Sequence, residues 1–346
     1  MTSIEEKFEE SKRLGLQIVK ESEEERLMTL SVGPQHPGSG HAAGAVNQRT
    51  SQMYAPCSYF RFVIKVDGDY IVYCDPDPGY VHRGEEKMCE YRNVIQNIPH
   101  LERPVIHDSA NINYSYSLAI EDLIGIEVPR RGQYIRAIAS ELNRQVYTLY
   151  WLAIYGIFLG HSTMFMWPTG DREVIIDLLE ALTGARVTHA FNIPGGVRND
   201  VPEGFKDRCL SQIRYLQKRF KEYEDIFYNN PLFRQRTEGV AVLSKEDAIK
   251  LGVTGSVVRA SSVPFDVRKA EPYDIYNEID FKVQYMKTGD CFARAYVPLL
   301  DMQESCYILE QLLDKIPASG EVRAKLQPNP KGPPGEAYRR VESGRG

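Results

Sequence analysis

The amino-acid sequence predicts an α+β protein, with a central α-helical bundle and a small β region at the N-terminal end. Apolar residues recur at helical spacing through most of residues 82–230, the pattern of packed amphipathic helices. Two β-rich runs flank Asp67-Gly68-Asp69, which predicts a hairpin ahead of the bundle. The length of 346 residues corresponds to about two domains and is enough to bury a large core.

The composition excludes several classes of protein. Hydrophobic residues make up 42% and charged residues 26% of the chain, the balance of an ordinary folded protein. The formal net charge of −5 argues against nucleic acid as a partner, because nucleic-acid binders carry a strong basic excess. No stretch approaches the ~18 consecutive apolar residues of a membrane span, and the N-terminus lacks the pattern of a secretory signal. We therefore expect an intracellular protein with no membrane-spanning segment of its own.

Residues 1–26 are expected to form a charged helical arm. The segment has too few apolar positions to be buried on its own, so it is either a mobile arm or strap across a partner, or a solvated helix. Residues 27–80 are expected to form the β region, with hairpin strands at Tyr59–Val66 and Tyr70–Cys74. The Gly-, Ser- and Asn-rich segment Gly33–Cys57, ahead of the hairpin, is predicted to be an extended loop.

Residues 81–316 are predicted to form the helical bundle, interrupted by an irregular insertion over residues 231–298. Beyond Val146 one segment is apolar on nearly all sides, which predicts a helix in the middle of the bundle. We expect Asp171 to be the N-cap of a helix that ends at Gly184, short strands within residues 254–298, and a Pro/Gly-rich tail without a core pattern over residues 317–346. The predicted helices are Ser117–Leu123, Arg131–Leu159, Asp171–Thr183, Gly204–Asn229 and Met302–Ile316.

The six cysteines do not form a metal-binding pattern. They are widely separated and include no Cys-x-x-Cys pair, so a chain without an export signal is expected to keep them as reduced thiols. The missing pairs also argue against structural zinc and against an iron–sulfur cluster held by this chain alone. We expect no metal site.

Polar side chains gather instead in four segments near predicted loop–helix junctions. Each is either a capped, salt-bridged turn or a functional loop, and the residues alone leave both readings open. The segments are Gly33–His41, Gly79–Lys87, Glu102–Asp108 and Gly184–Arg198.

Several of these strings resemble one family when taken in order. GPQHP, GYVHRGEEK, TGARVTH, PGGVRNDVPEGF and GEAYRRVES are similar to the catalytic D, or 49-kilodalton, subunit of respiratory complex I and of F(420)H(2)-dehydrogenase-type complexes. The resemblance covers about Gly33 to the end, and YGIFLGHSTMFMWP is closer to archaeal members. It implies a fold like the large subunit of nickel–iron hydrogenases without the metal centre, consistent with the missing Cys-x-x-Cys pairs.

The resemblance also implies the partners and the reaction. Members pack against a small subunit that carries a 4Fe-4S cluster, next to a 30-kilodalton-like subunit and a membrane-arm subunit. A quinone is reduced between the two hydrogenase-like subunits, and the redox energy drives ion translocation. We therefore expect a peripheral subunit on the cytoplasmic face of the cell membrane.

The residues implied for the quinone cavity depart in part from the family pattern. His41 corresponds best to the histidine that binds the quinone carbonyl, on a loop with His36, Gly38 and Gly40, although this loop is one residue longer and an insertion over 42–57 follows it. The family's tyrosine aligns with Ile106, beside His107, and its aspartate aligns with Phe158. Either the acceptor binds differently here, or it differs chemically, or it is not a quinone.

A second group of residues is implied near the partner's cluster. Arg83 and Arg103 match arginines whose charge would raise the cluster's reduction potential, although both could instead form salt bridges with Glu85, Glu86 or Glu102. The cluster-linked histidine aligns with Thr188, and His189 is its neighbour. Family members continue past the segment like GEAYRRVES, so we expect their further C-terminal segment to be truncated, missing or supplied by another polypeptide.

The leading prediction is thus an electron-transfer subunit of a complex I-like quinone oxidoreductase. A second is a ferredoxin-linked respiratory complex that reduces another acceptor, such as sulfur compounds. A third is a non-catalytic scaffold subunit.

Overall fold

The computed structural model describes residues 20–21, 27–33, 61–80, 82–327 and 330–345. The chain divides into two compact units after Gly84. The loop residues His36, Gly38, Gly40 and His41 lie outside the described residues.

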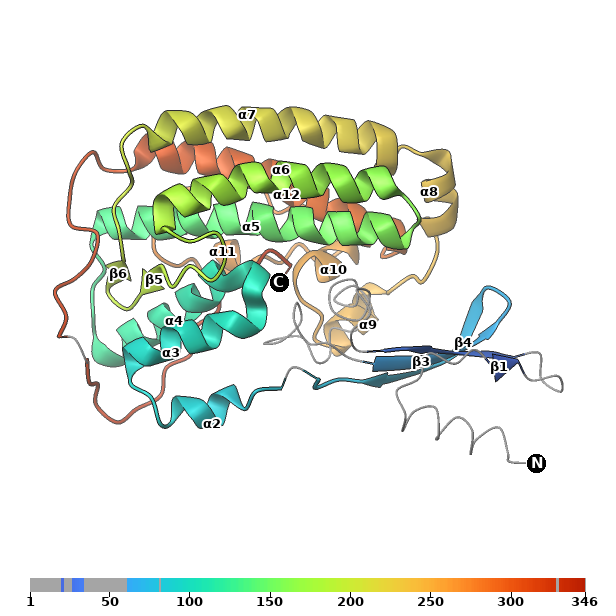
Figure 1. The fold of residues 1–346 in the computed structure, drawn as a ribbon, viewed down its shortest axis with the longest axis horizontal. Helices are drawn as coiled ribbons and strands as arrows, with labels where there is room; N and C mark the ends of the chain where they lie inside the picture. Colours follow the sequence, from blue (N-terminus) through green and yellow to red (C-terminus); the bar gives the residue numbers. More distant parts are fainter. Residues whose placement is uncertain (1–19, 22–26, 34–60, 81, 328–329, 346) are drawn as a thin grey trace. The chain divides into compact units, whose positions relative to one another are not determined.

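The first unit contains an antiparallel sheet with the strand order β1-β2-β3-β4 (Figure 1). The predicted hairpin is confirmed: β3 and β4 pair up to the ends of a tight turn, where Gly68 has a φ of 57°. The predicted helical arm differs from the structure at Lys20–Glu21, which pair with β2. The strands are β1 (Lys20–Glu21), β2 (Met28–Val32), β3 (Arg61–Asp67) and β4 (Tyr70–Asp77).

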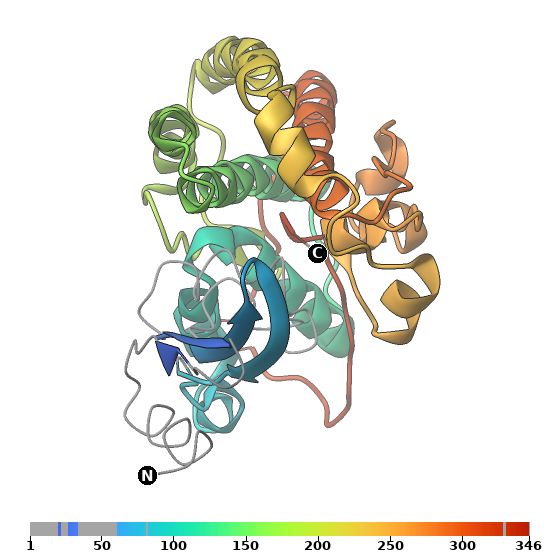
Figure 2. The ribbon, with the colours of Figure 1, turned by 90° about the vertical axis from the view of Figure 1, so that its right-hand side faces the viewer.

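The second unit is the predicted helical bundle. Its long helices α5, α6, α7 and α12 run lengthwise beside one another, with α6 and α12 each packed against both α5 and α7 (Figures 1 and 2). The α-helices are α2 (Glu85–Cys89), α3 (Val94–Glu102), α4 (Ser109–Ile124), α5 (Arg130–Phe158), α6 (Ser162–Thr183), α7 (Phe205–Tyr223), α8 (Pro231–Thr237), α9 (Lys245–Lys250), α10 (Gly255–Ala260), α11 (Val267–Ala270) and α12 (Cys291–Lys315). The shorter elements are the 3-10 helices η4 (Arg103–Asp108) and η6 (Tyr276–Glu278), the π-helical turn η5 (Glu224–Tyr228), and the strands β5 (Asn192–Ile193) and β6 (Gly196–Val197).

Helix α5 is the centre of this unit. Every residue from Tyr134 to Ile154 is buried except Tyr150, as the apolar pattern beyond Val146 predicted. Near its end, Gly156 allows close contact with α6, because a Cβ atom there would lie 2.6 Å from the Cβ of Met164. The two helices therefore form a tight antiparallel pair around the turn at residues 159–161.

Helix α6 begins earlier than the sequence predicts. His161 is its N-cap and accepts a hydrogen bond from the backbone N–H of Met164 at 3.2 Å. Asp171, predicted to be the cap, instead lies within the helix and is buried, where its carboxylate accepts hydrogen bonds from Tyr215 at 2.6 Å and from Arg219 at 2.7 Å. The carboxylate satisfies side chains of α7 rather than the backbone of its own helix.

The insertion at residues 231–298 also differs from expectation. The short strands predicted within residues 254–298 are absent from this fully described stretch, which forms α10, α11, η6 and connecting loops instead. Helix α12 begins at Cys291, about three turns before the predicted start, with Asp290 as its N-cap.

Residues 342–345, at the end of the tail, are buried or half-buried, although the tail has no apolar core pattern. Glu342 is 2% exposed, and its carboxylate accepts hydrogen bonds from Arg259 Nη1 at 2.7 Å and from the Val267 N–H at 3.0 Å. Arg144 of α5 donates to the carbonyls of Glu342 at 2.6 Å and Ser343 at 2.5 Å. We call residues 339–345 the C-terminal strap. Buried charge pairs and hydrogen bonds hold it in place, and Val341 packs against the hydrophobic core.

Candidate functional site

The short helix η4 presents the first predicted site residues. Ile106 is 42% exposed and His107 is half-buried. Asn143 of α5 fixes the backbone here, because its Nδ2 donates to the His107 carbonyl at 2.9 Å. The His107 ring stacks on Tyr150 of α5, with ring centroids 4.1 Å apart and an interplanar angle of 29°. An imidazole is thus held at the edge of the bundle against the central helix.

Phe158 lies away from this pair. It is the last residue of α5, about two helical turns or ~12 Å along the axis from Tyr150, and it is 40% exposed. Ile157 and Leu159 beside it are 41% and 40% exposed. Residues 145–170 contain no Asp, Glu, Lys or Arg, so this end of the α5–α6 pair contributes no acidic, lysine or arginine side chain of its own.

The loop containing Thr188 and His189 meets the junction of α3, η4 and α4. Thr188 and Ala190 have φ values of 52° and 42°, left-handed conformations that turn the loop sharply. His189 is 3% exposed, and its Nδ1 is 2.9 Å from the Ser109 hydroxyl at the start of α4. Burial lowers the pKa of His189 to about 4, so this imidazole is neutral at pH 7.

Glu102 anchors the same loop from the end of α3. It is 1% exposed, and its Oε2 accepts hydrogen bonds from the Ala190 N–H and from Asn113 Nδ2, each at 2.8 Å. Burial raises the pKa of Glu102, while the nearby charges of Arg103 and Arg198 oppose the rise. Arg103 itself is exposed and forms no ion pair with the rest of the described chain. The structure therefore brings the segment of Arg103 and His107 to one junction with Thr188 and His189.

Arg83 belongs to the first unit, where it is exposed. It is not placed relative to the residues of the second unit.

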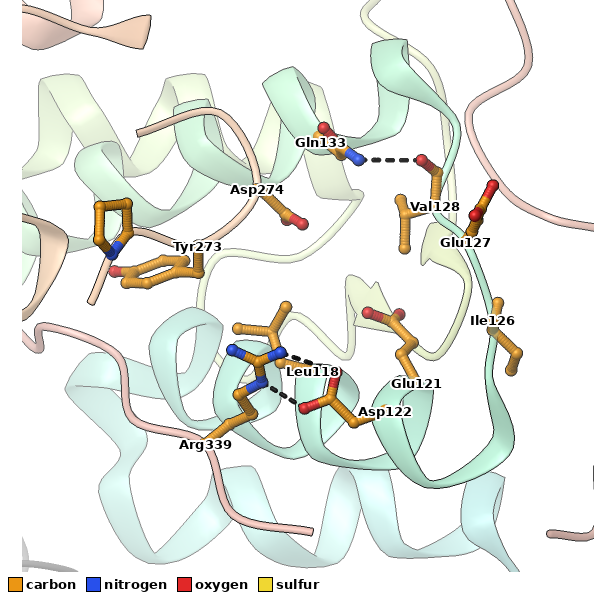
Figure 3. A pocket seen from close by; sticks show the side chains of 11 residues that line it. Leu118, Glu121, Asp122, Ile126, Glu127, Val128, Gln133, Tyr273, Asp274 and Arg339 are labelled. Carbon is orange, nitrogen blue, oxygen red and sulfur yellow. Dashed lines mark hydrogen bonds and ion pairs between the residues drawn. The ribbon is translucent and has the colours of Figure 1, made fainter. Parts of the chain in front are cut away.

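A cavity of about 340 Å³ lies elsewhere in the second unit (Figure 3). It is lined by the end of α4, the α4–α5 turn, residues 272–274 and Arg339 of the C-terminal strap. The Arg339 guanidinium pairs with Asp122 at its wall, with Nη2 2.8 Å from Oδ1. None of the predicted site residues lines this cavity.

Within the described ranges, no group of three or more His, Cys, Asp and Glu side chains is placed to hold a metal ion. Cys209 and Cys306 are buried, and burial raises the pKa of the Cys209 thiol to about 12, so it is not a thiolate. No helix in the described part of the chain is long and apolar enough to cross a membrane.

Sequence reasoning did not single out Tyr150. Its type and spacing are those of any tyrosine on a buried helix, and only the contact with His107 distinguishes it.

Comparisons with known proteins agree on one family. Residues 159–331 match the family model described as respiratory-chain NADH dehydrogenase, 49 Kd subunit. The D subunit of the F(420)H(2) dehydrogenase from Methanosarcina mazei is 40% identical over 333 residues, covering 95% of this chain and 84% of the relative. The D subunit of the NADH-quinone oxidoreductase from Desulforamulus reducens is 40% identical over 317 residues, covering 92% of this chain and 82% of the relative.

A solved structure agrees with the fold. A chain of the membrane-bound sulfane sulfur reductase, an archaeal respiratory membrane complex, is 36% identical with a TM-score of 0.82, covering 91% of this chain and 82% of that chain. The chain belongs to the family of the 49-kilodalton subunit of the respiratory-chain NADH dehydrogenase.

Proposed function

We propose that this chain is the electron-transfer subunit of a membrane-bound complex I-like oxidoreductase that reduces a quinone of the menaquinone type. The observation that carries the proposal is the 40% identity to the D subunits of F(420)H(2) dehydrogenase and NADH-quinone oxidoreductase over more than nine-tenths of the chain. Electrons would come from NAD(P)H, F(420)H(2) or ferredoxin through other subunits, and quinone reduction would be coupled to proton or ion translocation.

The quinone is a substrate in this proposal, and the 4Fe-4S cluster belongs to the small partner subunit. The quinone takes up two electrons from that cluster and two protons to become a quinol. His41 and His107 would donate hydrogen bonds to its carbonyl oxygens, because an imidazole can hold and pass on a proton near neutral pH. Gly38 and Gly40 would let the loop around His36 approach the headgroup. Ile106 and Phe158 would line the cavity.

Residues near the cluster would set its potential. The positive charges of Arg83 and Arg103 would favour the reduced cluster. Thr188 has no titratable group, and His189 is neutral with a pKa of about 4, so the potential should vary little with pH around neutrality. Further partners would be a 30-kilodalton-like subunit and a membrane-arm subunit at the cytoplasmic face of the membrane, with no nucleic acid involved.

Two substitutions in the assembled complex test the quinone site. We expect His41→Ala and His107→Ala to assemble normally and to lower quinone reduction by up to ~100-fold, because each removes a donor to the developing oxyanion. Electron paramagnetic resonance should show that the partner's cluster is still reduced by the donor. Turnover equal to that of the wild type in both variants would contradict these roles.

A third substitution tests the cluster contact. Arg103→Ala should assemble and should shift the cluster's potential or spectrum. Arg208→Ala, at an exposed position on α7, is the matched control and should leave both unchanged. Failed assembly of the Arg103 variant with an unchanged spectrum would assign this arginine a structural role instead.

One observation favours a second function. The chain is 36% identical to a chain of the sulfane sulfur reductase. It also has Ile106 and Phe158 where the family has polar side chains, and both observations are compatible with a sulfur compound as the electron acceptor. Measuring turnover of the purified complex with a quinone and with polysulfide separates the two. A complex that reduces neither acceptor would instead be consistent with a scaffold role.

A further inference from the structure

Tyr150 is the one place where the buried stretch of α5 from Tyr134 to Ile154 reaches the surface. Its neighbours on both sides, Leu149 and Trp151, are 0% and 2% exposed, whereas Tyr150 is half-buried. A half-buried tyrosine combines an apolar ring with a polar hydroxyl group.

Two other side chains that can bind a polar group lie against the Tyr150 ring. One is His107, whose ring stacks on it at 4.1 Å. The other is Arg172 of α6, whose guanidinium carbon lies 5.3 Å from the centroid of the Tyr150 ring. The only ion pair of Arg172 within the described ranges is a long one, 3.6 Å to Glu173, and its buried Nε has no hydrogen-bond partner in the structure.

The Tyr150 side chain presents a phenol hydroxyl, which can donate one hydrogen bond. Residues 145–170 contain no Asp, Glu, Lys or Arg, and the charges against this stretch include the cations Arg172, over Tyr150, and Arg345, 4.8 Å from the centroid of a Trp151 ring. Ile106, the exposed neighbour of His107, has no polar atom in its side chain. The surface therefore suits an apolar ring that carries carbonyl oxygens.

We infer that Tyr150 binds the electron acceptor directly, donating a hydrogen bond from its hydroxyl to a quinone carbonyl oxygen beside His107. The inference rests on the proposed function, since it names a further residue of the same quinone site. It assigns α5 an active part in binding, in addition to its place in the core.

The substitution Tyr150→Phe tests this role in the assembled complex. Phenylalanine keeps the ring that stacks on His107 and faces Arg172, and only the hydroxyl is lost. Tyr155→Phe is the matched control, because Tyr155 is on the same helix but packs into the interior aromatic cluster, 5.1 Å from Trp151 and 6.3 Å from Phe227. The probe is a water-soluble naphthoquinone with a short side chain, and the measurements are kcat, KM and reduction of the partner's cluster.

We expect Tyr150→Phe to lower kcat/KM for the naphthoquinone by about tenfold or more, the effect of one lost hydrogen bond. The Tyr155 variant should match the wild type, and the cluster should be reduced normally in both. Wild-type kinetics in the Tyr150 variant would overturn the inference while leaving the quinone site in place. A wild-type complex that reduces polysulfide but no naphthoquinone would overturn the proposed function and this inference with it.

Discussion

Replacing Glu342 with alanine tests whether the C-terminal strap stabilises the helical unit through buried charge. The carboxylate pairs with Arg259, and both side chains are almost fully buried, at 2% and 1% exposed. Removing one partner of a buried ion pair typically costs about 3–5 kcal/mol, because the other charge is left without compensation. Arg259 keeps its second partner, Asp301, at 2.6 Å, which favours the lower end of that range.

The substitution also removes the acceptor of the Val267 N–H, and an unsatisfied buried donor costs about 1–3 kcal/mol. Together these terms predict a loss of about 4 kcal/mol. For a protein of this size, 1 kcal/mol corresponds to about 2–4 °C in the melting temperature, so Tm should fall by about 10 °C. Thermal unfolding of the purified protein, followed by circular dichroism at about pH 7, measures this change.

The same strap provides a control at the surface. Arg340 pairs with Glu271, but these side chains are 39% and 53% exposed, and an exposed pair contributes at most about 1 kcal/mol. Glu271→Ala should therefore lower Tm by no more than about 3 °C. If the melting temperatures of the two variants differ by less than about 3 °C, the buried Glu342–Arg259 pair stabilises the protein no more than the exposed pair does, and the reasoning fails.

Three further predictions follow from other parts of the structure. Gly196→Ala should lower the free energy of unfolding far more than Gly204→Ala does, as measured by denaturant unfolding. A Cβ atom at Gly196 would lie 2.2 Å from the Val322 carbonyl oxygen, whereas a Cβ atom at Gly204 would meet open space. Equal losses in the two variants would contradict the close approach at Gly196. His189 has a pKa of about 4 in the folded state and about 6.5 when unfolded, so stability should fall by about 2 kcal/mol between pH 7 and pH 5 as the unfolded state binds the proton. His189→Asn, which keeps a polar partner for Ser109, should remove that fall, and an unchanged pH dependence would argue against a neutral buried imidazole. Elemental analysis of the purified chain should find less than one nickel, iron or zinc per molecule, since no Cys-x-x-Cys pair exists, and a stoichiometric metal would refute this expectation.

Periodicity predicted those parts of the fold that apolar burial determines. The β3–β4 hairpin and the buried stretch of α5 follow directly from patterns of two and of 3.6 residues. Asp171 was misplaced, and the burial of Glu342 was not predicted, because buried charges have no apolar signal. An aspartate with three donors from another helix and a glutamate paired with Arg259 are recognisable only when their partners are known.

The candidate site was predictable in its segments but not in its contacts. The resemblance pointed to the segments of Arg103 and His189, which meet at one junction through Glu102. It could not place Phe158, which lies about two turns beyond Tyr150. The stacking of His107 on Tyr150 joins residues far apart in the sequence, and no local pattern encodes such a contact.

The position of Glu342 in the sequence also bears on the order in which the protein is made. Arg259 emerges from the ribosome 83 residues before the carboxylate that pairs with it. At a synthesis rate of about 5–20 residues per second, the delay is on the order of 4–16 seconds, far longer than helix formation requires. During that time the helices can form, but Arg259 lacks one of its two buried partners and Arg144 lacks the strap carbonyls to which it donates. The strap can therefore insert only after its residues have been synthesised, seconds after the helices that it contacts have had time to form.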